Sequence, residues 1–367
     1  MEVKPSVPKR VLVIRLQNHG DVLLTTPLFS TLKRVFPGVE VDALVFAETM
    51  PMLESNPDLS SILPLPRGKQ AGRGWNRLRT FFSLMRKIRR RQYDWVLHLN
   101  DQWSGACAAL ISGAPLRFGY EIQKRDYWIW RRVFPHRIAP TSAGHMAEQN
   151  MAVLEALGLP VKREDMQCTM GYSHADTAAV TNRLTPLGVT GPYILIHPTS
   201  RWFFKCWEDD RFAEVITYLA DAGWKVVLTS SPDDRELELV KGLLQRVGAH
   251  SNVVSIAGQL SLPGLAAAIA GAALFIGVDS VPMHMAATLG VPIVALFGPT
   301  HVHIWRPWSK NAEVIHAADY GPLIAPNDVD TSTSDRYLSN IRVPSVLAAI
   351  DRQLLKIRSI QNGVEVD

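Results

Sequence analysis

The sequence predicts an α/β protein built from two Rossmann-like halves, and three observations lead to this prediction. Short apolar, β-rich runs alternate with amphipathic helical stretches, which is typical of parallel sheets covered on both faces. The alternation begins at residue 10 and begins again near residue 192, after a stretch that contains Thr185-Pro186 and Gly191-Pro192. Apolar residues make up 47% and charged residues 20% of the 367 residues, which excludes a disordered chain or a coiled coil.

The first half is predicted to open with a strand over residues 10–16, followed by a polar turn. A helix is predicted from Asp21 to about Val35, and Pro37-Gly38 ends it because these residues do not continue a helix. Two further strands are predicted over residues 39–46 and 95–99.

In the second half, strands again alternate with helices. The predicted strands are 193–197, 225–229, 253–256, 274–278 and 292–297, and the predicted helices are 212–222, 237–247, 265–270, 283–289 and 347–357. We therefore expect an N-terminal domain over 1–185, a second domain over 186–345, and a C-terminal helix and tail over 346–367 that packs back toward the N-terminal domain. Ligands of such folds bind at the carboxyl ends of the strands, so we expect the site in a cleft there.

The charges of the chain are unevenly divided. Residues 1–185 hold 25 Lys and Arg against 16 Asp and Glu, whereas the remainder holds 14 against 18. A basic half suggests an anionic partner, such as nucleic acid, an anionic glycan or a phospholipid surface. The longest apolar stretch, 265–278, is shorter than the roughly 20 residues that span a bilayer. No secretory signal is visible, and three scattered cysteines match no disulfide framework, so we expect a soluble, cytoplasmic protein.

Four turns between a strand and the next helix carry the polar residues of interest. The first, Asn18-His19-Gly20-Asp21, places a carboxylate at the start of a helix. The simpler interpretation is a helix N-cap, because Asp is among the residues preferred there. The functional interpretation is a general base at the strand end, with Gly20 allowing another group to approach closely.

The second turn begins at His197 and contains Thr199 and Ser200, with Lys205 just before the next helix. Hydroxyls and an ammonium in this position suit a phosphate or pyrophosphate, although a solvated polar loop has the same composition. The third turn ends with Asp234, whose carboxylate suits ribose hydroxyls, although a capped helix is the simpler interpretation.

The fourth turn contains Asp279, Ser280 and His284, with Pro282 in the first turn of the following helix. Backbone amides at this point can hold a diphosphate, with His284 nearby to donate a hydrogen bond, although a lone helical histidine is usually structural. The chain has no G-x-x-x-x-G-K-[ST] loop, no G-x-G-x-x-G after the first strand and no metal-ligand spacing. These absences argue against a P-loop NTPase, a dehydrogenase and a metal site.

The segment Arg67–Arg91 holds ten Lys and Arg and no Asp or Glu, interleaved with aromatic and aliphatic residues. A solvated basic helix face is the simpler interpretation. The mixture also fits a segment that lies on an anionic membrane surface or binds a phosphorylated acceptor. The candidate contacts are Arg67, Arg73, Arg77, Arg86, Arg89 and Arg90.

Taken together and in this order, the four turns resemble the ADP-heptose:lipopolysaccharide heptosyltransferases of glycosyltransferase family 9, from Arg10 to about Trp308. The most specific stretches are 20–27, 197–200 with Lys205 and Trp207, 279–284 and 297–300. The resemblance implies a GT-B fold, in which two Rossmann-like domains face each other across a cleft. It also implies an inverting transfer of heptose from ADP-L-glycero-D-manno-heptose to the heptose region of the lipopolysaccharide inner core, without a cofactor or metal ion.

By position, the resemblance implies that Asp21 is the catalytic base. It also implies that the residues that bind the donor are Thr199, Ser200, Lys205, Asp234, Asp279, Ser280 and His284. The basic half would bind the lipopolysaccharide acceptor and would associate peripherally with the cytoplasmic face of the inner membrane, without a nucleic-acid partner.

Two functions of other classes stay open on the sequence alone. A nucleotide-sugar epimerase of the same fold would share the diphosphate site, but it would leave the basic segment without a role. A non-catalytic binder of anionic glycans or nucleic acid would explain the basic half but not Thr199, Lys205 and His284.

Overall fold

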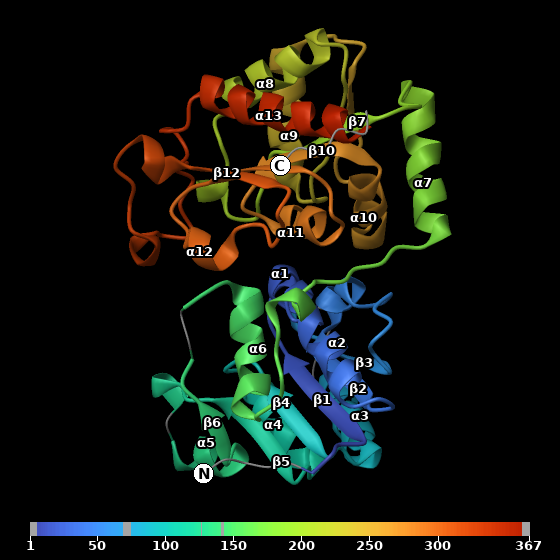
Figure 1. The fold of residues 1–367 in the computed structure, drawn as a ribbon, viewed down its shortest axis with the longest axis vertical. Helices are drawn as coiled ribbons and strands as arrows, with labels where there is room; N and C mark the ends of the chain where they lie inside the picture. The colour runs from blue at the N-terminus through green and yellow to red at the C-terminus, as the bar shows by residue number, and fades with distance from the viewer. Residues whose placement is uncertain (1–5, 69–74, 126, 141–142, 362–367) are drawn as a thin grey trace. The chain divides into compact units, whose positions relative to one another are not determined.

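The computed structural model describes residues 6–68, 75–125, 127–140 and 143–361 (Figure 1). The chain divides into two compact units, Met1–Gly171 and Tyr172–Asp367. This division lies earlier than the boundary that we expected at residue 185. The reason is that helix α7 (His174–Leu184) packs against α10 (Leu262–Ala270) and so belongs to the second unit.

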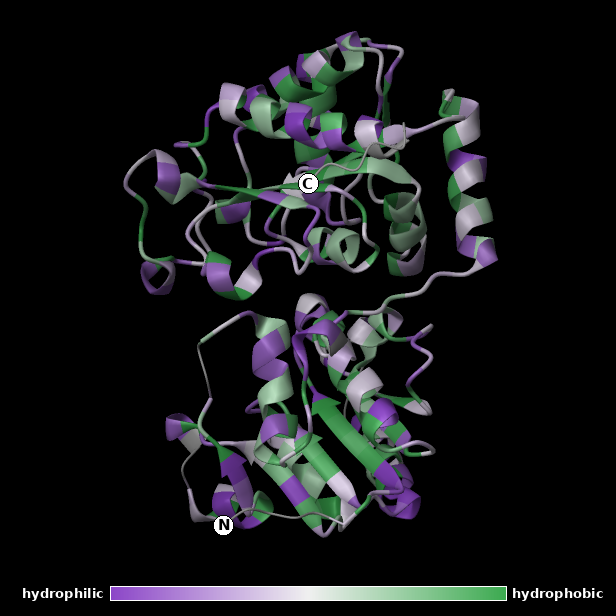
Figure 2. Cartoon of the chain, in the orientation of Figure 1, coloured by the Kyte–Doolittle hydropathy of each residue, from purple (hydrophilic) through white to green (hydrophobic). Residues whose placement is uncertain are grey.

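In the described part of the first unit, six parallel strands form one sheet in the order β3-β2-β1-β4-β5-β6. The central strand β1 is buried from Val11 onward, and its residues 11–14 are apolar, as the green of Figure 2 shows. The strands are β1 (Arg10–Arg15), β2 (Glu40–Phe46), β3 (Ser61–Leu65), β4 (Trp95–His98), β5 (Leu116–Tyr120) and β6 (His136–Ile138). The helices are α1 (His19–Leu23), α2 (Thr26–Val35), α3 (Trp75–Arg91), α4 (Trp103–Ser112), α5 (Trp128–Val133) and α6 (Met146–Ala156).

The helices of the first unit form two layers. The connection from β1 to β2 and the connection from β4 to β5 run in opposite directions across the sheet, so right-handed crossovers place α2 and α4 on opposite faces. Helix α2 packs against α6, whereas α3 packs against α4 and α4 packs against α5. One face is therefore covered by α2 and α6, and the other by α3, α4 and α5.

The helix predicted from Asp21 to Val35 is two helices in the structure. The short helix α1 begins at His19 and ends at Leu23, and α2 begins at Thr26 with Pro27 in its first turn. Proline has no backbone N–H to donate and its φ suits the start of a helix, so the chain begins a new helix there.

In the described part of the second unit, six parallel strands form a sheet in the order β12-β11-β10-β7-β8-β9. The strands are β7 (Tyr193–His197), β8 (Lys225–Leu228), β9 (Val253–Ser255), β10 (Ala272–Val278), β11 (Ile293–Phe297) and β12 (Ala312–His316). The helices besides α7 and α10 are α8 (Asp209–Asp221), α9 (Asp234–Val247), α11 (Val281–Thr288), α12 (Val302–Trp305) and α13 (Val343–Gln361).

The second unit is also layered. Figure 1 shows α8 and α13 along one face of its sheet and α10 and α11 along the other, and the contacts α8 with α9 and α10 with α11 agree. Helix α13 packs against α8 and against strands β10 to β12. Val346, Ala349 and Ile350 of α13 belong to this unit's core. The apolar side of α13 is therefore used within the second unit, and the expected return of residues 346–367 toward the N-terminal domain stays a prediction.

In the described residues, the helices are all too short or too polar to cross a bilayer.

Candidate active site

The turns that follow β7, β8 and β10 meet at one edge of the second unit's sheet. Strand β10 pairs with β7 so that Gly277 lies opposite His197, and β7 pairs with β8. A Cβ atom on Gly277 would lie 2.9 Å from the carbonyl oxygen of His197, so a larger residue would push these two strand ends apart. The glycine therefore allows the second and fourth turns of the sequence to lie side by side.

Lys205 and Asp279 form a buried ion pair at this edge. Lys205 ends the short 3₁₀ helix η6 (Phe203–Lys205), and its Nζ lies 2.7 Å from Oδ2 of Asp279, the first residue after β10. The ammonium also lies 5.0 Å from the centre of the Trp202 ring. Because an ammonium has three donors, Lys205 can donate to a phosphate oxygen and keep its bond to Asp279.

A second buried cluster lies beside this pair and contains His197, Thr199, Thr229 and Glu236. The Thr199 hydroxyl donates to Oε2 of Glu236 at 2.5 Å, and it lies 3.3 Å from Nε2 of His197. Nδ1 of His197 lies 3.0 Å from the Thr229 hydroxyl. Burial lowers the pKa of His197 to about 4, and the nearby Glu236 carboxylate partly opposes this shift. The imidazole is therefore neutral near pH 7. The Thr199 hydroxyl uses its one proton in the hydrogen bond to Glu236.

The structure places the remaining predicted donor residues as follows. Ser200 is buried beside Thr199, and its hydroxyl accepts a bond from the Trp202 amide at 3.4 Å. Ser280 is the N-cap of α11, but its hydroxyl donates to the carbonyl of Val278. His284 is buried in α11, with its ring 6.4 Å from that of Trp305.

Asp234 is exposed at the start of α9, and the buried carboxylate of the third turn belongs instead to Glu236. Asp233, not Asp234, caps the helix by accepting from the amide of Arg235. Asp234 as a contact of the adenosine stays a prediction, and the sequence also carries a signal for the buried carboxylate of Glu236. Glu236 precedes Leu239 by three residues and Leu243 by seven, so it lies on the apolar side of α9. An acidic residue on the buried side of a helix indicates a polar partner inside the protein.

In the first unit, Asp21 lies in α1 and pairs with Arg15 at the end of β1. Nη2 of Arg15 lies 3.0 Å from Oδ1 of Asp21, and the two side chains are only 7% and 13% exposed. The N-cap of α1 is Asn18, so the interpretation of Asp21 as an N-cap is wrong. The other terminal nitrogen of Arg15 donates to the carbonyl of Leu99, the residue after β4. Arg15 therefore fixes the carboxylate of Asp21 to the carboxyl edge of this sheet.

Similarity to known proteins decides the family. The family model described as glycosyltransferase family 9 (heptosyltransferase) matches residues 81–332. The chain is 36% identical over 336 residues to lipopolysaccharide heptosyltransferase 3 of Escherichia coli. The matched region covers 92% of this chain and 96% of that protein. The chain belongs to glycosyltransferase family 9. The predicted resemblance to the heptosyltransferases of this family is confirmed. Residues 16–21 and 204–207 suggest in particular lipopolysaccharide heptosyltransferase III, in agreement with the similarity of the whole chain to the E. coli protein.

Solved structures confirm the fold of this family 9 glycosyltransferase. A glycosyltransferase of family 9 from Veillonella parvula matches with a TM-score of 0.80 at 24% identity, over 95% of this chain and 97% of that chain. The E. coli ADP-heptose lipopolysaccharide heptosyltransferase II matches with a TM-score of 0.76 at 23% identity, over 95% and 99% of the two chains. The predicted α/β fold of GT-B type is therefore confirmed.

The basic segment of this glycosyltransferase is less free of partners than its composition suggests. Arg67 pairs with Glu48 and lies 4.1 Å from the centre of the Phe46 ring. Arg89 donates to the carbonyl of Ser112 at the end of α4. Arg77, Arg86 and Arg90 are exposed on α3, and Arg73 lies outside the described residues. Arg67 and Arg89 therefore already bind partners within this chain. Of the described arginines predicted to bind the acceptor, Arg77, Arg86 and Arg90 are the ones that stay available.

Proposed function

We propose that this glycosyltransferase transfers heptose from ADP-L-glycero-D-manno-heptose to the heptose region of the lipopolysaccharide inner core. The observation that carries the substrate assignment is the 36% identity to lipopolysaccharide heptosyltransferase 3 along nearly the whole length of both chains. The epimerase and the non-catalytic binder are less well supported, because neither fits membership in this family.

The second unit would bind the donor. In this proposal Lys205 donates to the diphosphate and stabilises the negative charge that develops on ADP as it leaves. Asp279 holds the ammonium in place, and Ser200, Ser280 and His284 supply further polar contacts around the sugar diphosphate. The network favours Glu236, rather than Asp234, as the acidic group for the adenosine ribose, with Thr199 positioning its carboxylate.

Asp21 would act as the general base of a single displacement. Its carboxylate takes the proton of the acceptor hydroxyl while that oxygen bonds to the anomeric carbon of the heptose. The bond from the anomeric carbon to the ADP oxygen breaks on the opposite side, so the configuration inverts and ADP leaves with the electron pair. The bond from Arg15 would aim the carboxylate of Asp21.

The acceptor is a lipid-anchored glycan, so we propose that the enzyme works in peripheral contact with the cytoplasmic face of the inner membrane. Arg77, Arg86 and Arg90 are among the exposed cations of α3 and would meet the phosphates of the acceptor.

The experiment that tests this function combines the protein with ADP-heptose and a lipopolysaccharide truncated within its heptose region. Mass spectrometry of the lipid should show the gain of one heptose, and one ADP should be released for each heptose transferred. Conversion of ADP-heptose without an acceptor would select the epimerase, and binding without any turnover would select the non-catalytic binder.

A further inference from the structure

The outer surface of α3 carries exposed apolar side chains. Trp75 is 80%, Phe82 is 64% and Leu78 is 48% exposed. These residues are three, four and seven positions apart, so they lie on one side of the helix. Another side of the helix faces the core of the first unit through Leu84, Met85 and Ile88. Helix α3 therefore has two apolar sides, and the described residues cover only one of them.

Cations alternate with the aromatic residues along this outer side. Trp75, Arg79, Phe82, Arg86 and Arg90 follow one another at intervals of three or four residues, so they form one stripe along α3. In the described part of the chain no carboxylate lies within ion-pair distance of these three arginines, which are exposed. Cations without internal partners leave their charge available to an external anion.

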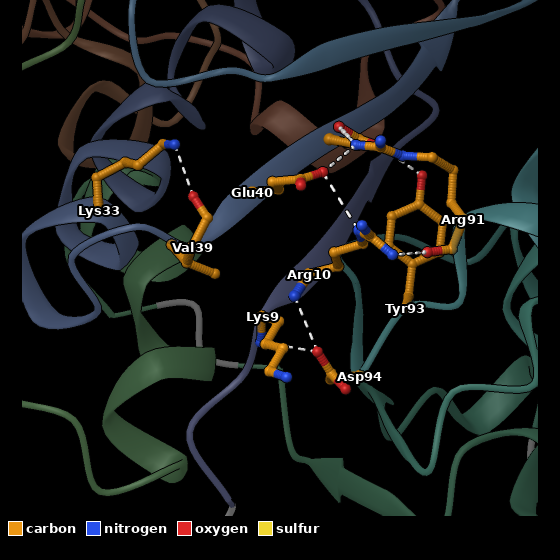
Figure 3. A network of polar contacts seen from close by, with 9 residues as sticks. Lys9, Arg10, Lys33, Val39, Glu40, Arg91, Tyr93 and Asp94 are labelled. Atoms are coloured by element: carbon orange, nitrogen blue, oxygen red, sulfur yellow. Dashed lines mark hydrogen bonds and ion pairs between the residues drawn. The ribbon is translucent and has the colours of Figure 1, made fainter.

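The end of α3 is fastened to the sheet, so the stripe is held in place. Arg91 pairs with Glu40 at 2.8 Å (Figure 3). It also pairs with the fully buried Asp42 at 2.8 Å. The Tyr93 hydroxyl donates to the same carboxylate of Asp42 at 2.6 Å. Arg91 is thus a structural residue, unlike its neighbour Arg90. Next to it, Ser83, Arg86, Lys87, Arg90 and Arg91 line an open hollow of about 460 Å³.

We propose that α3 docks this enzyme on an anionic bilayer, with Trp75 and Phe82 inserted among the headgroups and Arg79, Arg86 and Arg90 bound to lipid phosphates. Aromatic side chains beside cations are the composition that favours a membrane interface. The stripe follows one helix of 17 residues, about 25 Å long, which is narrow for a stable protein interface. This docking rests on the proposed function, because the bilayer would be the membrane that carries the lipopolysaccharide acceptor.

The test is co-sedimentation of the full chain with vesicles, without donor or acceptor. The wild-type protein should bind vesicles of equimolar phosphatidylcholine and phosphatidylglycerol and should not bind phosphatidylcholine alone. Replacing Arg79, Arg86 and Arg90 by Gln should weaken binding on the order of a hundredfold, because each cation near an anionic surface contributes about fivefold. Replacing Trp75 and Phe82 by Ser should weaken it roughly tenfold.

Matched controls lie in the second unit. Leu355 of α13 is 62% exposed, so Leu355→Ser removes an exposed apolar side chain similar to Phe82. Replacing the exposed Arg183, Lys241 and Arg352 by Gln removes the same net charge as the α3 variant. Both controls should bind vesicles as the wild type does. Equal loss in the controls, unchanged binding of the Trp75 and Phe82 variant, or no wild-type binding to anionic vesicles would each overturn the proposal.

A transfer assay separates this proposal from the proposed function. The Trp75→Ser, Phe82→Ser variant should keep the wild-type kcat/KM for a water-soluble, deacylated acceptor and show a raised KM for an acceptor carried in vesicles. If the wild type transfers heptose to neither acceptor, the proposed function fails, while the vesicle binding still decides whether α3 docks on membranes.

Tryptophan fluorescence offers a direct readout of insertion. Vesicles whose lipids carry brominated acyl chains should quench the wild type more strongly than Trp75→Phe, because the bromines lie within the bilayer. Equal quenching of the two proteins would overturn the insertion of Trp75.

Discussion

The buried site of the second unit and the outer surface of helix α3 differ in how their charged groups are partnered. In the second unit, Lys205 and Asp279 form a buried ion pair, and Glu236 accepts a hydrogen bond from Thr199. In the first unit, Arg15 and Asp21 form a comparable pair, but the cations of α3 remain exposed. The difference teaches that charge serves two purposes here. Paired charges hold a polar site in a fixed geometry, whereas the exposed cations Arg79, Arg86 and Arg90 have no ion-pair partner among the described residues, which leaves their charge available to an external anion.

The largest expected effect is that of Asp21→Asn, which removes the proposed base and keeps the size of the side chain. Transfer should fall by about a hundredfold to ten-thousandfold, the range of general base catalysis. Affinity for ADP should not change by calorimetry, because Lys205 and Glu236 of the second unit are intact. Since the variant leaves Arg15 without its carboxylate, a thermal melt must accompany the assay. Turnover near that of the wild type in a folded variant would remove Asp21 from the mechanism.

The next effect concerns Lys205→Ala, which should weaken donor binding and slow transfer together. A hydrogen bond to a charged group contributes roughly 1.5–3 kcal/mol, so we expect a tenfold to hundredfold loss of ADP affinity. The variant also leaves Asp279 buried without its cation, which destabilises the fold. The double variant Lys205→Ala, Asp279→Asn should regain stability but not ADP affinity. Unchanged ADP affinity in either variant would remove Lys205 from the donor site.

Much of this second-unit geometry was predictable from the sequence. Asp279 and Lys205 each follow a strand and precede a helix in the sequence, and parallel strands bring such positions to one edge. The distance between strand ends could not be predicted, since it depends on which strands are neighbours. The order β10-β7-β8 places Gly277 beside His197, although the two are far apart in the sequence.

The first unit shows what local patterns leave out. The composition of 67–91 indicates cations without carboxylate partners. In the structure Arg91 pairs with Asp42 of β2, and Arg67 pairs with Glu48 just after β2. The partner of Asp21 was likewise unforeseen. In the sequence Arg15 is simply the polar end of a strand, and its bond to Asp21 depends on how the intervening turn folds.

A smaller effect is expected at Arg15, which we place as a positioning residue for Asp21. Arg15→Met should lower kcat about tenfold with little change in donor KM, since one charge-assisted bond is lost. Arg15→Lys keeps the charge and should recover part of the rate. The split between kcat and donor KM provides the decisive measurement, because a residue that positions Asp21 changes kcat and leaves the donor groups of the second unit unchanged. A folded Arg15→Met variant with the kcat of the wild type would show that Arg15 is only structural.

The smallest expected effect is a loss of unfolding free energy in mild acid. One buried histidine in each unit contributes to it. Burial lowers the pKa of His98 to about 3 and that of His197 to about 4, against an ordinary value of 6.5. Below about pH 6.5 the unfolded chain takes up protons that the folded chain does not, so stability falls as the pH falls through this range. The loss continues until the folded histidines are themselves protonated, near pH 4 for His197 and pH 3 for His98.

His98→Leu isolates the contribution of the first unit. The His98 ring stacks on Phe134 with centroids 4.9 Å apart, so an apolar replacement keeps part of this packing. Between about pH 7 and pH 5.5 each buried histidine should cost about 1 kcal/mol of unfolding free energy. Urea unfolding followed at both pH values should therefore show a smaller acid-induced loss in the variant than in the wild type. An equal loss in both proteins would mean that His98 is protonated in the folded first unit, and that its burial does not set the acid sensitivity of that unit.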